Sequence, residues 1–355
     1  MSATKKNPVL VGVDQSVANR RACDYACEVA AASRAPLLMV QVVEPPFDAV
    51  PVNVLDTLVE WAAEELTERA GELRTFNDGL EIECIVRRGA PWDQLATLAV
   101  ERDAQLVVVG TFGRRGVARA LLGSVAEKVV RTSPRPVVTV PAHAFANRSQ
   151  AGRRLASLLG RQKLAAPSVI AISRGAIPVA LEVARRLAAP LDLWLTEPMV
   201  SQGHEMGALG EDGHPFFDDR ASAFTAEERA QAEHEAYRRM TRELERLRGS
   251  LSPGEVWKRT AIVVSDGIAS SSSIIAATRA MRSLGAERTI AAAPIVSKRV
   301  LAAVRKHCDD VVYVETAMLA EVPECWYRHP TLPTARAARA ALAAYDPSAS
   351  TAIAS

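Results

Sequence analysis

The stretch that decides the fold of the first half of the chain is residues 107–140, VVVGTFGRRGVARALLGSVAEKVVRTSPRPVVTV. It begins and ends with apolar runs of strand length, and a glycine-containing loop and a helix lie between them. Gly110, Gly113, Gly123 and Ser124 follow the spacing G-x2-G-x9-G-S. Because glycine lets a backbone approach a ligand closely, this spacing predicts a strand, a ligand-binding loop, a helix and a second strand.

The ligand that suits such a loop is an anion. The amides of Gly123, Ser124 and Val125 are expected at the start of the helix, where unpaired N–H groups and the helix dipole favour negative charge. A tight loop whose helix is capped by Ser124 explains the same residues without a ligand. The long fixed spacing, followed by EKVV at residues 127–130 and then by a Pro-Val-Val strand, favours the phosphate-binding loop.

Length and composition limit the classes of protein to consider. A chain of 355 residues suggests two domains. The net charge of +2 gives no reason to expect a nucleic acid or an anionic membrane as partner. No apolar run has the length of a membrane span, and the N-terminus does not resemble a signal peptide. We therefore expect a cytoplasmic protein.

The five cysteines contain no C-x-x-C pair. Cys23 and Cys27 are one helical turn apart, which suits either a metal site or two small core residues. In a reducing cytoplasm the core interpretation is favoured.

The first half alternates strand and helix patterns, which predicts a parallel sheet with helices on both faces, a doubly wound α/β domain over residues 1–144. Ligands bind such sheets beyond the carboxyl ends of the strands. Asp14 follows the first strand and Gly110 the fourth, so both suit a ligand site, although Asp14 also suits an Asx turn or a helix cap. The expected strands are 9–13, 37–43, 80–87, 105–109 and 136–140, and the expected helices include 19–32, 54–75 and 91–102.

Residues 7–142 resemble the universal stress protein family. The resemblance is carried by VGVDQS at 11–16, VQVVEPP at 40–46, and the glycine loop with its helix and the PVVTV strand at 136–140. It implies the strand order 3-2-1-4-5, adenine nucleotide binding with slow or no hydrolysis, and a homodimer formed through PVVTV.

The resemblance also assigns roles to single residues in an ATP site. Asp14 contacts the ribose and phosphates, and the backbone of Val42 binds the adenine. The phosphates lie on the glycine loop, which contributes Gly110, Gly113, Gly123, Ser124 and Val125.

The second half begins after residues 141–150, PAHAFANRSQ, which break the pattern and suggest a domain boundary. Residues 196–219 have no clear period and predict a long surface loop. Residues 225–247 predict a helix that opens with a capping box, Thr225 and Glu228, and whose interleaved charges form a solvated face. Further strands are expected at 168–173, 191–195, 289–296 and 311–314, and further helices at 150–164, 179–187 and 335–345.

The stretch of the second half that carries chemistry is residues 261–280, AIVVSDGIASSSSIIAATRA. A strand ends at Ser265 and Asp266, a turn follows at Gly267, and a serine run precedes a helix. Hydroxyls and amides at a helix start suit either an anion site or a serine-rich cap, and the residues alone leave both open.

Three segments together resemble the phosphoribosyltransferase family: AGRRLASLLG at 151–160, VIAISRGAIPVALEVARRLAAPLDLWL at 169–195, and VVSDGIASSSSIIAATRAMRSLGA at 263–286. The resemblance implies a second Rossmann-like parallel sheet, a type I phosphoribosyltransferase-like domain over 149–333, followed by a helix and tail at 334–355. It implies that Asp266 faces ribose hydroxyls, directly or through magnesium. It places a pyrophosphate loop on 173–176, with Arg174 and Gly175, and a phosphate loop on Ala269, Ser270, Ser271, Ser272 and Ser273.

The sequence departs from that family at three places. Ser265 replaces the first acid of an acidic pair, and serines replace the T-G-A-T of the phosphate loop. No Arg-Lys pair follows residue 195, where the nearest charge is Glu197; such cations would offset the charge on departing pyrophosphate. His204 suits either an acid–base role or an exposed loop, and the aromatic cluster at 326–329 suits either the core or the rim of a base pocket.

These observations favour a cytoplasmic stress-response protein that binds ATP in its first domain. Its second domain would then be a degenerate phosphoribosyltransferase-like module that senses a ligand or contacts a partner. The alternative is an active, magnesium-dependent phosphoribosyltransferase regulated by adenine nucleotide, with Asp266 as the catalytic and metal-binding residue. Whether the chain is an enzyme stays open, and a dimeric scaffold with neither site occupied is a third hypothesis.

Overall fold

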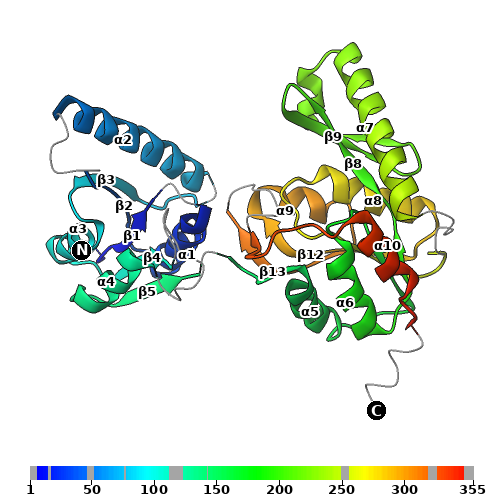
Figure 1. Ribbon diagram of the computed structural model, residues 1–355, viewed down its shortest axis with the longest axis horizontal. Helices are drawn as coiled ribbons and strands as arrows, with labels where there is room; N and C mark the ends of the chain where they lie inside the picture. Colours follow the sequence, from blue (N-terminus) through cyan, green and yellow to red (C-terminus); the bar gives the residue numbers. More distant parts are fainter. Residues whose placement is uncertain are drawn as a thin grey trace. The chain divides into compact units, whose positions relative to one another are not determined.

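The computed structural model describes residues 6–14, 17–45, 52–75, 77–111, 123–141, 143–248, 256–318 and 326–347. The chain divides into two compact units, Met1–Ala144 and Phe145–Ser355, and each contains its own five-stranded sheet (Figure 1).

The first unit is built on a parallel sheet of order β3-β2-β1-β4-β5, which confirms the predicted fold class and strand order. The central strands are almost fully buried, as expected when helices cover both faces of a sheet. The strands are β1 (Val9–Val13), β2 (Leu37–Val43), β3 (Ile82–Arg88), β4 (Leu106–Gly110) and β5 (Val137–Val140), and the helices are α1 (Val17–Ser33), α2 (Val52–Arg74), α3 (Pro91–Glu101) and α4 (Ser124–Thr132).

The second unit has a parallel sheet of order β13-β12-β11-β6-β7. Alternate residues of its strands face opposite layers: Val169 packs with α5, α6 and α7, and Ile170 packs with α8 and α9. The strands are β6 (Pro167–Ala171), β7 (Leu191–Leu193), β11 (Thr260–Val264), β12 (Arg288–Ser297) and β13 (Asp310–Ala317), and the helices are α5 (Arg148–Leu159), α6 (Ile177–Leu187), α7 (Ala226–Leu247), α8 (Ser272–Ser283), α9 (Lys298–Arg305) and α10 (Ala335–Ala343).

The prediction of a long surface loop at 196–219 is wrong. This segment forms a three-stranded antiparallel sheet, β8 (Thr196–Ser201), β9 (His204–Gly210) and β10 (Pro215–Phe217), followed by a short 3-10 helix at Asp219–Ala223. Gln202 and Gly203 both have positive φ, as a two-residue hairpin turn requires. Gly207 lies so close to β10 that an added Cβ would come within 2.1 Å of the Phe216 carbonyl oxygen. Because glycine is uncommon in strands, such residues make the strands hard to predict from the sequence, although the close contacts of the fold require them.

The starts of two helices in the second unit can be compared with the predictions. The capping box at Thr225 and Glu228 is present at the start of α7, as predicted. The helix α9 was not predicted, and it begins after Ser297, whose hydroxyl accepts a hydrogen bond from the amide of Arg299. Among the described residues, no helix combines the length and apolar character needed to cross a membrane.

Candidate functional site

The first unit brings its predicted ligand residues to one edge of the sheet. Val13 pairs with Gln41, so Asp14 and Val42 are the next residues on two neighbouring strands. Gly110 ends β4, which pairs with the other side of β1. Parallel strands have their carboxyl ends at the same edge of a sheet, so Asp14, Val42 and Gly110 lie at one edge, where such sheets bind ligands.

The start of α4 lies at this same edge. The amide of Gly123 donates a hydrogen bond to the carbonyl oxygen of Thr111, directly after β4, at 2.5 Å. Gly123 is the N-cap residue and no side chain caps the helix, so the interpretation of Ser124 as its cap is wrong. Among the described residues, which exclude 112–122, the first-turn amides of Ser124 and Val125 have no hydrogen-bond partner, as an anion site at a helix start requires. Gly113 lies outside the described residues.

Cys23 and Cys27 belong to the core of the first unit. Both are fully buried, and the Cys23 thiol contacts the Oδ1 atom of Asn19 at 3.2 Å. Burial raises the pKa of Cys23 to about 11, so its thiol stays protonated at neutral pH. Across the described part of the chain, no three His, Cys, Asp or Glu side chains gather as metal ligands would.

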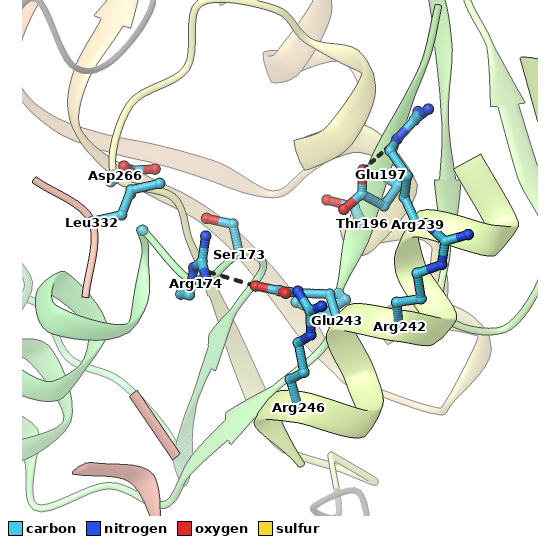
Figure 2. A pocket seen from close by; sticks show the side chains of 12 residues that line it. Ser173, Arg174, Thr196, Glu197, Arg239, Arg242, Glu243, Arg246, Asp266 and Leu332 are labelled. Carbon is cyan, nitrogen blue, oxygen red and sulfur yellow. Dashed lines mark hydrogen bonds and ion pairs between the residues drawn. The ribbon is translucent and has the colours of Figure 1, made fainter. Parts of the chain in front are cut away.

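The second unit contains a cavity of about 480 Å³ at the carboxyl end of β6. Figure 2 shows the side chains of its lining converging from the loop after β6, from β8 and from α7. The lining also includes Asp266, which the sequence analysis assigned to chemistry. Its residues are Ser173, Arg174, Gly175, Leu195, Thr196, Glu197, Arg239, Arg242, Glu243, Arg246, Asp266 and Leu332.

Asp266 is held in a buried ion pair with a residue that the sequence analysis did not identify. Its Oδ2 atom lies 2.8 Å from Nε of Arg148, whose side chain is only 3% exposed. The Arg148 guanidinium also donates to the carbonyl oxygen of Pro330 at 2.6 Å and lies 4.8 Å from the Tyr327 ring centroid. Tyr327 is buried and donates to the carbonyl oxygen of Asp266, so Trp326 and Tyr327 of the predicted cluster belong to the core, whereas Arg328 and His329 are exposed.

The loop after β6 packs tightly against Asp266. The amide of Ala176 donates to Oγ of Ser173 at 3.1 Å and closes the turn that starts α6. An added Cβ on Gly175 would lie 2.4 Å from Oδ2 of Asp266, so only glycine fits there. Nε of Arg174 is 3.3 Å from Oε1 of Glu243 on α7 and makes no hydrogen bond of good geometry, which leaves a buried donor unsatisfied.

The serine loop, residues 269–273, is contacted by carboxylates of the same chain. Oγ of Ser270 donates to Oε1 of Glu205 in β9, and Oγ of Ser272 donates to Oδ2 of Asp218 at 3.1 Å. Burial opposes ionisation of Asp218, but hydrogen bonds from Arg220 outweigh it and hold the pKa of Asp218 below its ordinary value. Asp218 is therefore ionised at neutral pH beside the loop that the sequence predicts to bind phosphate.

The remaining loop residues and His204 have less specific surroundings. Ala269, Ser271 and Ser273 are half-buried around the start of α8, and Ser271 is its N-cap residue but makes no side-chain cap. His204 is exposed at the turn between β8 and β9 and does not line the cavity.

The charged face of helix α7 is exposed, as predicted, and part of that face also borders the cavity. Arg239, Arg242 and Arg246 line the cavity, so this part of the helix is not simply a solvated face (Figure 2). Their spacing of three and four residues puts them on one face of a helix, a signal that the sequence contained. The sequence did not indicate that a cavity lies beside this face of the helix.

Comparison with known proteins gives a family for the first unit. The model of the universal stress protein family matches residues 6–141. A universal stress protein of Thermus aquaticus is 32% identical over 136 residues, which cover 37% of this chain and 96% of that protein. The chain belongs to the universal stress protein family. A solved universal stress protein in complex with cAMP is 31% identical and covers 39% of this chain and 98% of that one, with a TM-score of 0.31.

The rest of this universal stress protein is similar to proteins of another kind. A protein of Mycobacterium tuberculosis, provisionally named a phosphoribosyl transferase, is 33% identical over 181 residues. The match covers 49% of this chain and 41% of that protein. The chain thus spans less than half the length of this relative. The second half is therefore phosphoribosyltransferase-like, in agreement with the resemblance found in the sequence.

Proposed function

We propose that the first unit binds an adenine nucleotide, with ATP as the expected ligand, and that the protein serves a cytoplasmic stress response. The phosphates would lie on the amides of Ser124 and Val125; the amide of Gly123, which the sequence analysis also assigned to them, already donates to the carbonyl oxygen of Thr111. The observation that carries the proposal is the uncapped start of α4, held at the end of β4 by the hydrogen bond from Gly123 to Thr111. A phosphate satisfies such amides and is favoured by the helix dipole.

The rest of the nucleotide would follow the sheet edge. Asp14 would contact the ribose and phosphates, the backbone of Val42 the adenine, and Gly110 and Gly113 the phosphates. Position at the carboxyl ends of β1, β2 and β4 supports these roles for Asp14, Val42 and Gly110. Homodimer formation through β5 is also a proposal, supported by its position at the edge of the sheet, where one side of the strand has no neighbouring strand among the described residues.

Isothermal titration calorimetry with ATP tests the nucleotide site. Gly123 has φ −70° and ψ 155°, which valine also adopts, so Gly123→Val should fold while its side chain blocks the phosphate approach. Thr132→Ala, at the far end of the same helix, is the matched control. We expect ATP binding by the wild type and by Thr132→Ala and none by Gly123→Val. Equal affinity in all three proteins would refute the assignment.

For the second unit we propose a ligand-sensing or interaction module with little or no transferase activity. Two observations support this. The carboxylate of Asp266 is already paired with buried Arg148, so it is poorly available to magnesium or to ribose hydroxyls. Glu205 and Asp218 contact the serine loop, and their negative charge disfavours a phosphate there.

The alternative, a magnesium-dependent phosphoribosyltransferase with Asp266 as its catalytic and metal-binding residue, is favoured by the cavity itself. It joins Asp266 to the loop with Arg174 and Gly175, as a transferase site would require. The test is pyrophosphate release from phosphoribosyl pyrophosphate and magnesium, with purine and pyrimidine bases in turn. We expect no release above the background; release that Asp266→Asn abolishes would establish the enzyme.

A further inference from the structure

The cavity of the second unit carries an excess of positive charge. Its lining contains four arginines and three acids. The negative charge of one acid, Asp266, is offset from behind by Arg148. Two further pairs form across the cavity wall, Arg239 with Glu197 at 3.3 Å and Arg174 with Glu243 at 3.3 Å. The remaining excess is therefore two positive charges.

That excess resides on Arg242 and Arg246. Within the described residues neither makes an ion pair or a hydrogen bond, and both are exposed, so water solvates them when no ligand is bound. They are four residues apart on α7 and border the same cavity (Figure 2). Two guanidinium groups on one helix face can bind a polyanion through charge-assisted hydrogen bonds.

The opposite wall of the cavity adds polar groups to this pair. Nε of Arg174 is a buried donor that lacks a hydrogen bond. The lining also contains the side chains of Ser173 and Thr196. Small polar groups that line the same cavity as two cations without an ion-pair partner among the described residues suit a compact anion that carries more than one charge.

The surroundings of the serine loop are negatively charged, whereas the cavity beside α7 is positively charged. Its hydroxyls at Ser270 and Ser272 are bonded to the carboxylates of Glu205 and Asp218. An anion entering there would have to displace hydrogen bonds and approach two negative charges, of which Arg220 offsets one. Anion binding in the second unit is therefore disfavoured at the serine loop and favoured beside α7.

We propose that Arg242 and Arg246 are the anion-recognising residues of the second unit, and that the ligand is a small molecule bearing a diphosphate or a similar polyanionic group. This rests on the proposed role of the unit as a ligand-binding module and specifies its ligand class. Arg242 and Arg246 supply cations from α7, where the sequence lacks an Arg-Lys pair after β7. The serine loop makes a structural contact with Glu205 of β9 and with Asp218, which follows β10, and does not hold the phosphate.

The test is titration of the full chain with inorganic pyrophosphate, with inorganic phosphate in a parallel titration. Every protein carries Gly123→Val, so the proposed nucleotide site of the first unit contributes nothing to the signal. If the nucleotide proposal fails, this result stays readable because Arg242→Gln and Arg246→Gln change only the second unit. The variants are Arg242→Gln, Arg246→Gln and Ser270→Ala, and Arg238→Gln is the control, an exposed arginine of the same helix that does not line the cavity.

We expect pyrophosphate to bind more tightly than phosphate, and Arg242→Gln and Arg246→Gln each to weaken it roughly fivefold. This is less than the full effect of a hydrogen bond to a charged group, because the side chains are exposed. Ser270→Ala and Arg238→Gln should bind as the parent does. No binding at millimolar pyrophosphate, an equal loss in Arg238→Gln, or loss in Ser270→Ala with none in the arginine variants would each overturn the proposal.

Discussion

Replacement of Arg148 by methionine should strongly destabilise the second unit. The change keeps most of the side-chain volume but leaves the Asp266 carboxylate buried with its cation removed. The pair is 2.8 Å apart and the two side chains are 3% and 10% exposed, so solvent cannot replace the lost partner. Removing one member of a buried ion pair costs about 3–5 kcal/mol.

The loss can be measured as a shift of the melting temperature of this unit. For a domain of this size, 1 kcal/mol corresponds to about 2–4 °C, so Arg148→Met should lower the melting temperature by roughly 6–20 °C. Scanning calorimetry can resolve the transition, and the transition that moves in Arg148→Met is assigned to the second unit, which contains both members of the pair.

A double-mutant cycle isolates the pair from other effects of the substitution. Arg148→Met, Asp266→Asn and the double variant should give a coupling free energy of about 1–3 kcal/mol. Arg154→Met is the matched control, because Arg154 is half exposed, contacts Phe145 and pairs with Glu315 at 3.5 Å, and such surface pairs contribute at most about 1 kcal/mol. If Arg148→Met cost no more than this control, or the cycle were additive, the assignment of Asp266 to a structural ion pair would be refuted.

Three further predictions concern other residues of the second unit. Gly175→Ala should lower the free energy of unfolding by about 1–3 kcal/mol in chemical denaturation, because its Cβ would overlap Asp266, and a neutral result would contradict the packing. Thr225→Ala should cost about 1 kcal/mol by removing the capping box with Glu228, and a double variant with Glu228→Ala should lose little more. Burial raises the pKa of Glu197 above its ordinary value, so this residue's stabilising contribution is complete below pH about 4.5 and is lost as the pH rises through the raised pKa. The free energy of unfolding of the wild type should therefore fall relative to that of Glu197→Gln between pH 4 and 7. Parallel pH profiles of the two proteins would contradict the shift.

The sequence was sufficient to predict the first sheet because its signals are local. Continuous apolar runs such as residues 37–43 indicate strands covered on both faces, and the alternation with helices leaves few topologies. The position of Asp14 and Gly110 at one sheet edge follows from that topology alone. Gly113 and the rest of 112–122 lie outside the described residues, so the middle of the glycine loop stays a prediction.

The second unit shows where such reasoning fails. The strands at 196–219 are short and contain glycines at close contacts, so their period is weak although tertiary packing stabilises them. The Arg148–Asp266 pair joins residues 118 positions apart, and no local pattern indicates which of 43 lysines and arginines is the partner. The arginines of α7 have a visible periodicity, but only the fold determines that a cavity faces them.

The proposed nucleotide site of the first unit depends most on main-chain amides that can bind a polyphosphate. Hydrogen–deuterium exchange of the full chain, with and without saturating ATP, measures this at Ser124 and Val125 themselves. The account predicts that ATP slows exchange at the start of α4 and leaves its C-terminal end, near Thr132, unchanged. ATP that binds with no change in exchange at these two amides would contradict it.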